Sequence, residues 1–194
     1  MTLAVEHLAR LKARTVDKFR IDQIPEWLEE NTTLRMRPFS FKSHEFQRAI
    51  LSDTSQELVI RKPSQVGLTE ATMRLALATC AIRDYYTIIY TLPTSTLVTR
   101  MFSPRVDQVL TDSPKLKALM SSDSVDNTSL KEIGTSMMYM QGSTSTSSPI
   151  SIPADELIHD ELDFSDPGII EQYQSRLTAS KYRVKKKFST PTVP

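Results

Sequence analysis

Short runs of β-branched and aromatic residues alternate with helical segments along this chain, and that alternation limits its fold more than any other feature. Patterns typical of strands occur at residues 57–61, 85–92, 136–140, 154–162 and 183–190. Patterns typical of helices occur at residues 43–51, 69–82, 95–110 and 169–177. Strands that alternate with helices form a mostly parallel sheet with helices on both faces. The sequence therefore predicts an α/β domain.

The first 30 residues differ from the rest, because their apolar residues have helical spacing and no strand pattern interrupts them. The apolar positions are Leu3, Val5, Leu8, Leu11, Phe19, Ile21 and Ile24. A polar break follows at residues 31–33. We therefore expect a small helical N-terminal segment, residues 1–35, that packs against a main domain of residues 36–194.

Two residues should shape individual helices. We predict that Ser43 is the N-cap of the helix over residues 43–51, because a serine hydroxyl can accept from a free N–H of the first turn. Pro104 should interrupt or kink the helix over residues 95–110, because proline has no N–H to donate and its ring collides with the preceding turn.

Charge and cysteine content exclude several classes of protein. The formal net charge of the 194 residues is only +1, so any nucleic-acid contact would have to come from the basic clusters at residues 10–20 and 181–187. Each cluster fits a solvated charged face equally well. The single cysteine, Cys80, excludes an intramolecular disulfide and a cysteine-based metal cage. The chain has no bilayer-length apolar run and no signal peptide, so we expect an intracellular protein without a membrane partner.

A candidate phosphate-binding loop lies between the strand over residues 57–61 and the helix over residues 69–82. The usual pattern, G-x-x-x-x-G-K-[ST], places lysine directly before the hydroxyl residue, but this chain has Leu68 there. Lys62 stands at the position of the first glycine and could reach the phosphates from the opposite side of the loop. Gly67 would let the backbone approach the nucleotide, and Thr69 would offer its hydroxyl to Mg²⁺. The residues predicted to surround the phosphates are Lys62, Pro63, Ser64, Gln65, Val66, Gly67, Leu68 and Thr69. By itself the altered pattern also fits a chance match in a strand, turn and helix.

A pair of adjacent acids ends the apolar run over residues 157–161. Ligands of open α/β sheets bind beyond the carboxyl ends of the strands, so Asp160 and Glu161 should meet the loop there. Asp160 would hold Mg²⁺ next to Thr69, and Glu161 would orient and deprotonate the attacking water. The alternative is an ordinary acidic strand end or helix cap.

Five motifs, in their order along the chain, resemble the large subunit of tailed-phage terminases, particularly the lambda-type group, in which the lysine stands at the beginning of the phosphate loop. They span roughly residues 38–194 and are Arg61–Thr69, Tyr90–Thr94, Gly142–Ser145, Leu157–Glu161 and Phe188–Thr192. The resemblance implies a RecA-like P-loop NTPase fold of the ASCE type, which hydrolyses ATP with Mg²⁺ and pumps double-stranded DNA into an empty procapsid. It also implies the small terminase subunit and the portal protein as partners, a homo-oligomeric ring, and the host cytoplasm as the location.

The same resemblance assigns roles to single residues. Lys62, Gly67 and Thr69 would bind phosphate and magnesium, Asp160 would bind magnesium, and Glu161 would be the catalytic base.

Further residues resemble other parts of the family's machinery. Ser189 and Thr190 resemble a coupling motif that senses the γ-phosphate. Gln47 resembles the glutamine that reads adenine, since an amide can donate and accept at the base edge; an exposed helix glutamine is the alternative. Phe39 and Phe41 could stack on the base or pack in the core.

The resemblance also implies an arginine finger, because the charge of the transition state calls for a further cation. Arg61 lies beside the loop and could act within its own subunit. Arg100 and Arg105 could act on a neighbouring subunit, and surface positions are the alternative for all three.

The family continues into a C-terminal nuclease domain, which is absent from this sequence, so we expect ATP hydrolysis without DNA cleavage. Two other readings remain open on the sequence: a helicase or remodelling ATPase fragment, and a non-catalytic scaffold with a degenerate nucleotide site.

Overall fold

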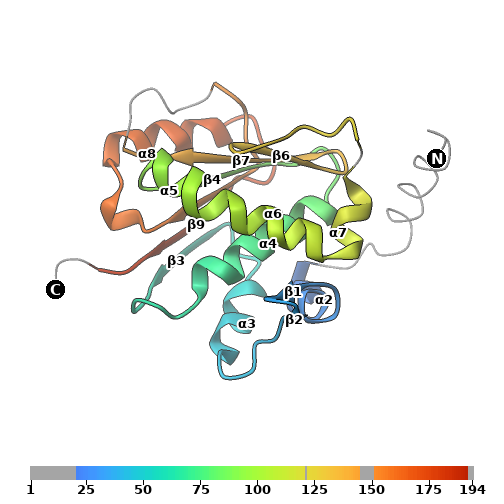
Figure 1. The fold of residues 1–194 in the computed structure, drawn as a ribbon. Coiled ribbons are helices and arrows are strands. Elements are labelled where there is room, and N and C mark those ends of the chain that lie inside the picture. The colour runs from blue at the N-terminus through green and yellow to red at the C-terminus, as the bar shows by residue number, and fades with distance from the viewer. Residues whose placement is uncertain (1–20, 121, 145–150, 192–194) are drawn as a thin grey trace.

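The computed structural model describes residues 21–120, 122–144 and 151–191, and Figure 1 shows how their helices and strands are arranged. The helical pattern predicted before residue 21, and most of the loop predicted after Gly142, lie outside the described residues.

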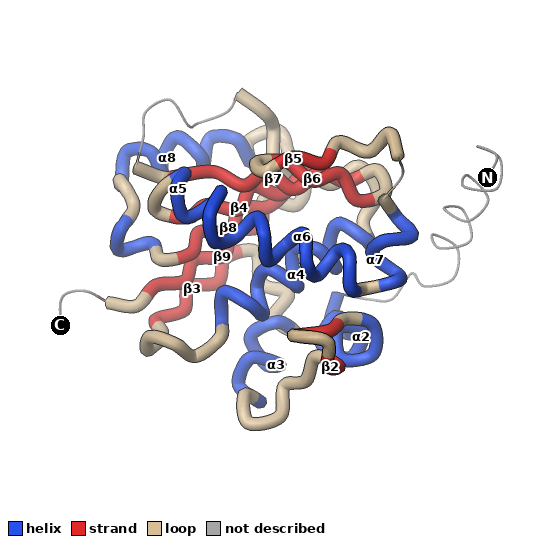
Figure 2. The backbone as a smooth tube through the Cα atoms, in the orientation of Figure 1, coloured by secondary structure: helices blue, strands red, loops and turns tan. Residues whose placement is uncertain are grey.

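A seven-stranded sheet forms the centre of the domain (Figure 2). The first five strands in spatial order are parallel, whereas the last two run antiparallel to their neighbours. The order is β3 (Glu57–Arg61), β9 (Val184–Ser189), β8 (Glu156–Asp160), β4 (Thr87–Leu92), β7 (Ser136–Gly142), β6 (Leu130–Ile133) and β5 (Asp126–Asn127). The predicted mostly parallel sheet is confirmed.

The antiparallel strands β6 and β5 are not predicted from the sequence. A tight turn joins β6 to β7, and Gly134 in that turn has a φ of +65°. Within β6 the buried position 131 is a lysine, which hides the apolar alternation of a strand. The ammonium of Lys131 forms ion pairs with Asp107, at 2.5 Å, and with Asp126, so the charge is compensated where it is buried.

Helices cover both faces of the sheet, as predicted. On one face α4 (Leu68–Ile82), α6 (Ser103–Asp112) and α7 (Pro114–Leu119) pack with Ile88 and Tyr90 of β4 in a large apolar core. On the other face α8 (Pro167–Gln174) packs with Ile89 in a smaller core. Successive side chains of a strand point to opposite faces, so one apolar strand serves both cores.

The N-terminal elements pack on α4 and belong to the larger core. They are the 3₁₀ turn η1 (Ile21–Gln23), α2 (Ile24–Asn31), the hairpin of β1 (Thr33–Leu34) and β2 (Arg37–Pro38), and α3 (Glu45–Leu51). Ile24 and Leu28 of α2 are fully buried there, together with Phe41, which therefore packs in the core. The boundary proposed between residues 35 and 36 falls in the turn of the β1–β2 hairpin.

The prediction that Ser43 is an N-cap is wrong. Helix α3 begins at Glu45, and His44 takes the cap position. Ser43 has a φ of +70°, and its N–H donates to Oε1 of Glu45 at 3.1 Å. The serine therefore lies one residue before the cap position.

The prediction for Pro104 is confirmed. The helical stretch divides into α5 (Ser95–Leu97), the π-helical turn η2 (Val98–Phe102) and α6, and the proline lies in the first turn of α6. The wide turn accommodates a ring that an uninterrupted α-helix would exclude.

The predicted helix over residues 169–177 ends in a 3₁₀ turn, η4 (Ser175–Leu177). Within the described ranges, none of the helices is both long enough and apolar enough to cross a membrane.

Candidate active site

The loop over residues 62–69 joins the carboxyl end of β3 to the N-terminus of α4. Gly67 is the N-cap of α4 and has a φ of +70°, which side chains with a Cβ rarely adopt. A Cβ at this position would also lie 3.1 Å from Nε2 of Gln47. The free N–H groups at the start of α4 therefore lie next to the loop that carries Lys62 and Gly67, where they could bind a phosphate.

Lys62 points at the acid pair and not into solvent, since only 7% of it is exposed. Its Nζ lies 2.6 Å from Oε1 of Glu161 and 3.3 Å from Oγ1 of Thr190. Its backbone N–H donates to the carbonyl of Ser189 at 2.9 Å. The side chain of the displaced lysine therefore lies between the loop and the acid pair, where it could contact a bound phosphate.

Asp160 is the last residue of β8 and is 1% exposed. Burial raises the pKa of this carboxyl, and the opposing effects are hydrogen bonds from Thr69 and Tyr90 and the charge of Lys62. Its Oδ1 accepts the backbone N–H of Glu161 at 3.0 Å. A buried carboxylate with a threonine hydroxyl beside it needs a cation to offset its charge.

Tyr90 begins the motif Tyr90–Thr94, but its contact with the acid pair is not predicted from the sequence. Its hydroxyl lies 3.1 Å from Oδ2 of Asp160 and 2.8 Å from Oγ1 of Thr72 on α4, so it connects the acid to the helix that follows the loop. The Tyr90 ring packs against Phe102, with 4.3 Å between ring centroids. In the sequence this tyrosine looks like one more apolar strand residue, and only the pairing of β4 with β8 brings it to the acid.

Glu161 follows β8 in a left-handed conformation, with a φ of +54°. Such a conformation is uncommon for a residue with a side chain and is often found at functional sites. The carboxylate is partly exposed; Oε1 accepts from Lys62, and Oε2 accepts the N–H of Thr190 at 3.4 Å. The predicted base is thus engaged by the loop lysine and by the residue that follows β9.

The structure separates the two residues of the predicted coupling motif. Thr190 faces Lys62 and Glu161, whereas Oγ of Ser189 accepts the N–H of Asp163 at 2.9 Å. Arg61 lies with Ser189 and Asp163 along a surface depression, on the side of β3 that points away from α4. The structure therefore does not bring Arg61 to the acid pair, and its role as a finger within the subunit stays a prediction.

Gln47 lies next to the loop and is buried, not exposed as the alternative reading had it. Its Nε2 donates to the carbonyl of Val66 at 2.7 Å. The amide group thus holds the loop directly before Gly67, and a role in reading adenine stays a prediction.

His159 directly precedes the acid pair, and its side chain is fully buried on the face of β8 opposite to that of Asp160. Its Nδ1 lies 2.7 Å from Oγ1 of Thr91, and its Nε2 has no partner among the described residues. Burial, with a smaller effect of the Lys187 charge, lowers the pKa of this imidazole to about 4. His159 is therefore neutral at physiological pH and serves the packing of β8 against β4.

The oxygen donors of Thr69 and Asp160 fit a magnesium ion, which prefers hard oxygen ligands and keeps part of its shell for waters and phosphates. In the described ranges no three side chains of His, Cys, Asp or Glu gather into a metal cage. A metal at this site would accordingly depend on the phosphates of a nucleotide for further ligands.

A candidate phosphate loop after one parallel strand, with paired acids at the end of another strand of the same sheet, is the arrangement of the RecA-like P-loop NTPases, whose fold this domain has. Residues 34–192 match the family described as "Phage terminase large subunit gpA, ATPase domain", and the chain belongs to this family. No curated protein sequence matches the chain.

Solved structures with a similar fold include two phage terminases. The large terminase ATPase domain of Thermus phage P74-26 superposes with a TM-score of 0.63 at 17% identity, over 78% of this chain and 66% of that one. The large terminase of the thermophilic bacteriophage D6E superposes with a TM-score of 0.51 at 13% identity, over 70% of this chain and 34% of that one. The chain thus spans about a third of the length of the D6E protein, and at these identities the likeness concerns the fold.

Proposed function

We propose that this domain hydrolyses ATP with Mg²⁺ and that the released energy moves double-stranded DNA into a viral procapsid. The observation that carries the proposal is the convergence of Lys62, Asp160 and Glu161 at one edge of the sheet, in a chain of the terminase ATPase family. The family match favours this reading over a helicase fragment.

In the proposed mechanism the contact between Lys62 and Glu161 is a resting state. An incoming triphosphate carries more negative charge than one carboxylate, so Lys62 would exchange Glu161 for phosphate oxygens. That exchange would release the carboxylate of Glu161 to accept a proton from the attacking water. Nucleotide binding would thereby prepare the base for catalysis.

The remaining residues have supporting roles in this proposal. Thr69 and Asp160 would hold Mg²⁺, which would supply positive charge to the phosphate oxygens. Thr190 contacts both Lys62 and Glu161, so loss of the γ-phosphate would change its hydrogen bonds and move the end of β9. Gln47 would hold the loop, and Arg100 or Arg105 would be candidates for a finger acting on a neighbouring subunit.

We further propose the assembly in which the motor works. Its partners would be double-stranded DNA, the small terminase subunit and the portal protein, with copies of the chain arranged in a ring in the host cytoplasm. The support for these partners is membership of the terminase family.

The direct test is phosphate release from ATP with and without duplex DNA. Glu161→Gln should lower turnover by about a hundredfold or more while nucleotide still binds, because a general base contributes on that order. Lys62→Ala should abolish binding as well as turnover. Lys42→Ala, at an exposed lysine away from the site, is the matched control and should behave as wild type. Unchanged turnover in Glu161→Gln would favour the non-catalytic scaffold.

A further inference from the structure

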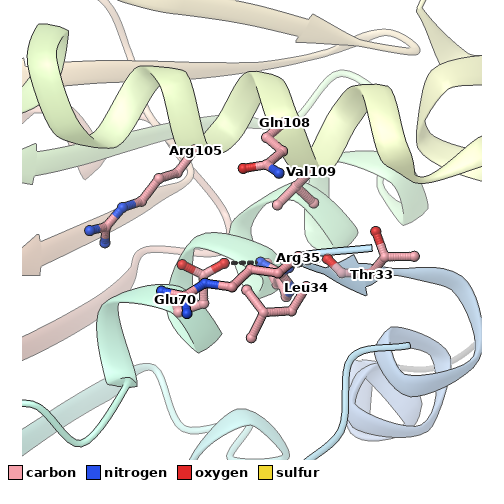
Figure 3. A pocket seen from close by; sticks show the side chains of 8 residues that line it. Thr33, Leu34, Arg35, Glu70, Arg105, Gln108 and Val109 are labelled. Atoms are coloured by element: carbon pink, nitrogen blue, oxygen red, sulfur yellow. Dashed lines mark hydrogen bonds and ion pairs between the residues drawn. The ribbon is translucent and has the colours of Figure 1, made fainter. Parts of the chain in front are cut away.

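A cleft of about 420 Å³ lies between α4, α6 and the β1–β2 hairpin, apart from the acid pair. Arg105 and Gln108 project from α6, and Arg35 reaches from the hairpin toward Glu70 on α4 (Figure 3). The fourth charged side chain on its wall is Arg74 of α4. Three guanidinium groups therefore face a single carboxylate.

That carboxylate is already compensated. Glu70 pairs with Arg74, which is 1% exposed, also donates to the carbonyl of Thr33, and lies over the Phe39 ring at 4.8 Å. Burial lowers the pKa of Arg74, although Glu70 opposes the change. The pair contributes no net charge to the cleft, so the charges of the other two arginines are in excess.

The side chains of Arg35 and Arg105 are exposed and make no hydrogen bond or ion pair with any residue in the described ranges. Arg35 has a φ of +51° in the turn of the hairpin, which directs it across the cleft. Two unpaired guanidinium groups on opposite walls favour an anion between them.

The buried wall of the cleft has unsatisfied polar atoms as well. Nε of Arg74 and Oγ1 of Thr33 are buried and have no hydrogen-bond partner in the described part of the chain. Buried donors left without partners are uncommon and costly. Both residues line the cleft, so the wall beside the two free guanidinium groups is polar and suits a ligand with acceptor oxygens.

We propose that this cleft binds a phosphate group, held by the guanidinium groups of Arg35 and Arg105 against the polar wall formed by Arg74 and Thr33. A tetrahedral phosphate offers more acceptor oxygens than a carboxylate and matches donors that come from several directions. The cleft opens to the surface, so the phosphate can belong to a free anion or to the backbone of DNA. The proposal does not depend on ATP hydrolysis at Lys62 and Glu161.

Titration calorimetry with inorganic phosphate tests the site. Wild type and Lys62→Ala should both bind phosphate in the cleft, since Lys62 lies outside it. The double variant Arg35→Gln/Arg105→Gln should bind phosphate at least about tenfold more weakly. The loss of one hydrogen bond to a charged group is enough to lower the binding constant by about this factor. Arg37→Gln/Lys42→Gln is the matched control: it removes two exposed cations near the same hairpin, neither of which lines the cleft.

Equal phosphate binding by the double variant and wild type would overturn the proposal. Loss of all phosphate binding in Lys62→Ala would also overturn it, because the only phosphate site would then be the loop. Acetate that competes as well as phosphate would also overturn it.

A labelled DNA duplex distinguishes the source of the phosphate. If the backbone occupies the cleft, the double variant should lower the slope of log K against log salt by about 1, whereas the control keeps the wild-type slope. An unchanged slope together with weaker phosphate binding would assign the cleft to a free phosphate.

Discussion

Replacing Tyr90 with phenylalanine would remove the hydroxyl that contacts Asp160, the acid proposed to hold Mg²⁺, and keep the ring that packs against Phe102. The hydroxyl bridges Asp160 and Thr72, and Thr72 retains its own bond to the carbonyl of Leu68 at 3.0 Å. The main loss is therefore a hydrogen bond to a buried carboxylate, which is worth about 1.5–3 kcal/mol.

This loss should appear in two measurements of ATP hydrolysis. At the lower end of that range, the apparent affinity for Mg²⁺ falls about tenfold, because 1.4 kcal/mol corresponds to a factor of ten. The pKa of Asp160 is already raised by burial, and the Tyr90 hydrogen bond opposes that rise. Its removal raises the pKa further, so the acid limb of the pH–rate profile should move to higher pH.

Tyr86→Phe is the matched control for this experiment. Tyr86 is also buried, and its hydroxyl lies 3.1 Å from Oε2 of Glu156, at the opposite end of β8. Both variants should lose stability in urea denaturation, but only Tyr90→Phe should change the Mg²⁺ and pH dependence. If Tyr90→Phe and Tyr86→Phe show the same Mg²⁺ dependence of turnover and the same acid limb of the pH–rate profile, Tyr90 does not position Asp160.

Two further predictions concern the backbone and the buried imidazole. Gly67→Ala should cost about 1–3 kcal/mol of folding free energy and weaken nucleotide binding, because of its positive φ and the nearby Gln47 amide. Gly134→Ala, which has a similar φ but nothing near its Cβ, should lose stability and keep binding; an equal loss of binding in both would contradict the argument. His159 has a folded-state pKa of about 4, below its ordinary value, so the unfolded chain takes up the proton first. The free energy of unfolding should therefore fall by up to about 3 kcal/mol as the pH drops from about 6.5 toward 4. Urea denaturation at several pH values measures this dependence, and His159→Gln should make it weaker.

Much of the local structure follows from the sequence because it depends on near neighbours. The strand at 57–61 and the helix that begins at 68 agree with their predicted bounds to within a residue. Their patterns of β-branched and helix-forming residues, with Gly67 between them, require no distant partner. Strand β6, the hairpin partner of the predicted strand β7, was not predicted, because its buried position 131 is a lysine whose charge is compensated by Asp107 and Asp126.

The sequence by itself determined the ingredients of the site, which are a loop lysine, a loop glycine, a threonine and two adjacent acids at the end of one strand. Only the tertiary structure decided how they meet. The strand order places β9 between β3 and β8, so Thr190 contacts both Lys62 and Glu161. The pairing of β4 with β8 brings Tyr90 to Asp160, and alternation along β3 turns Arg61 away. Strand order and register come from packing between distant segments, whereas a local pattern records only the neighbours of each residue.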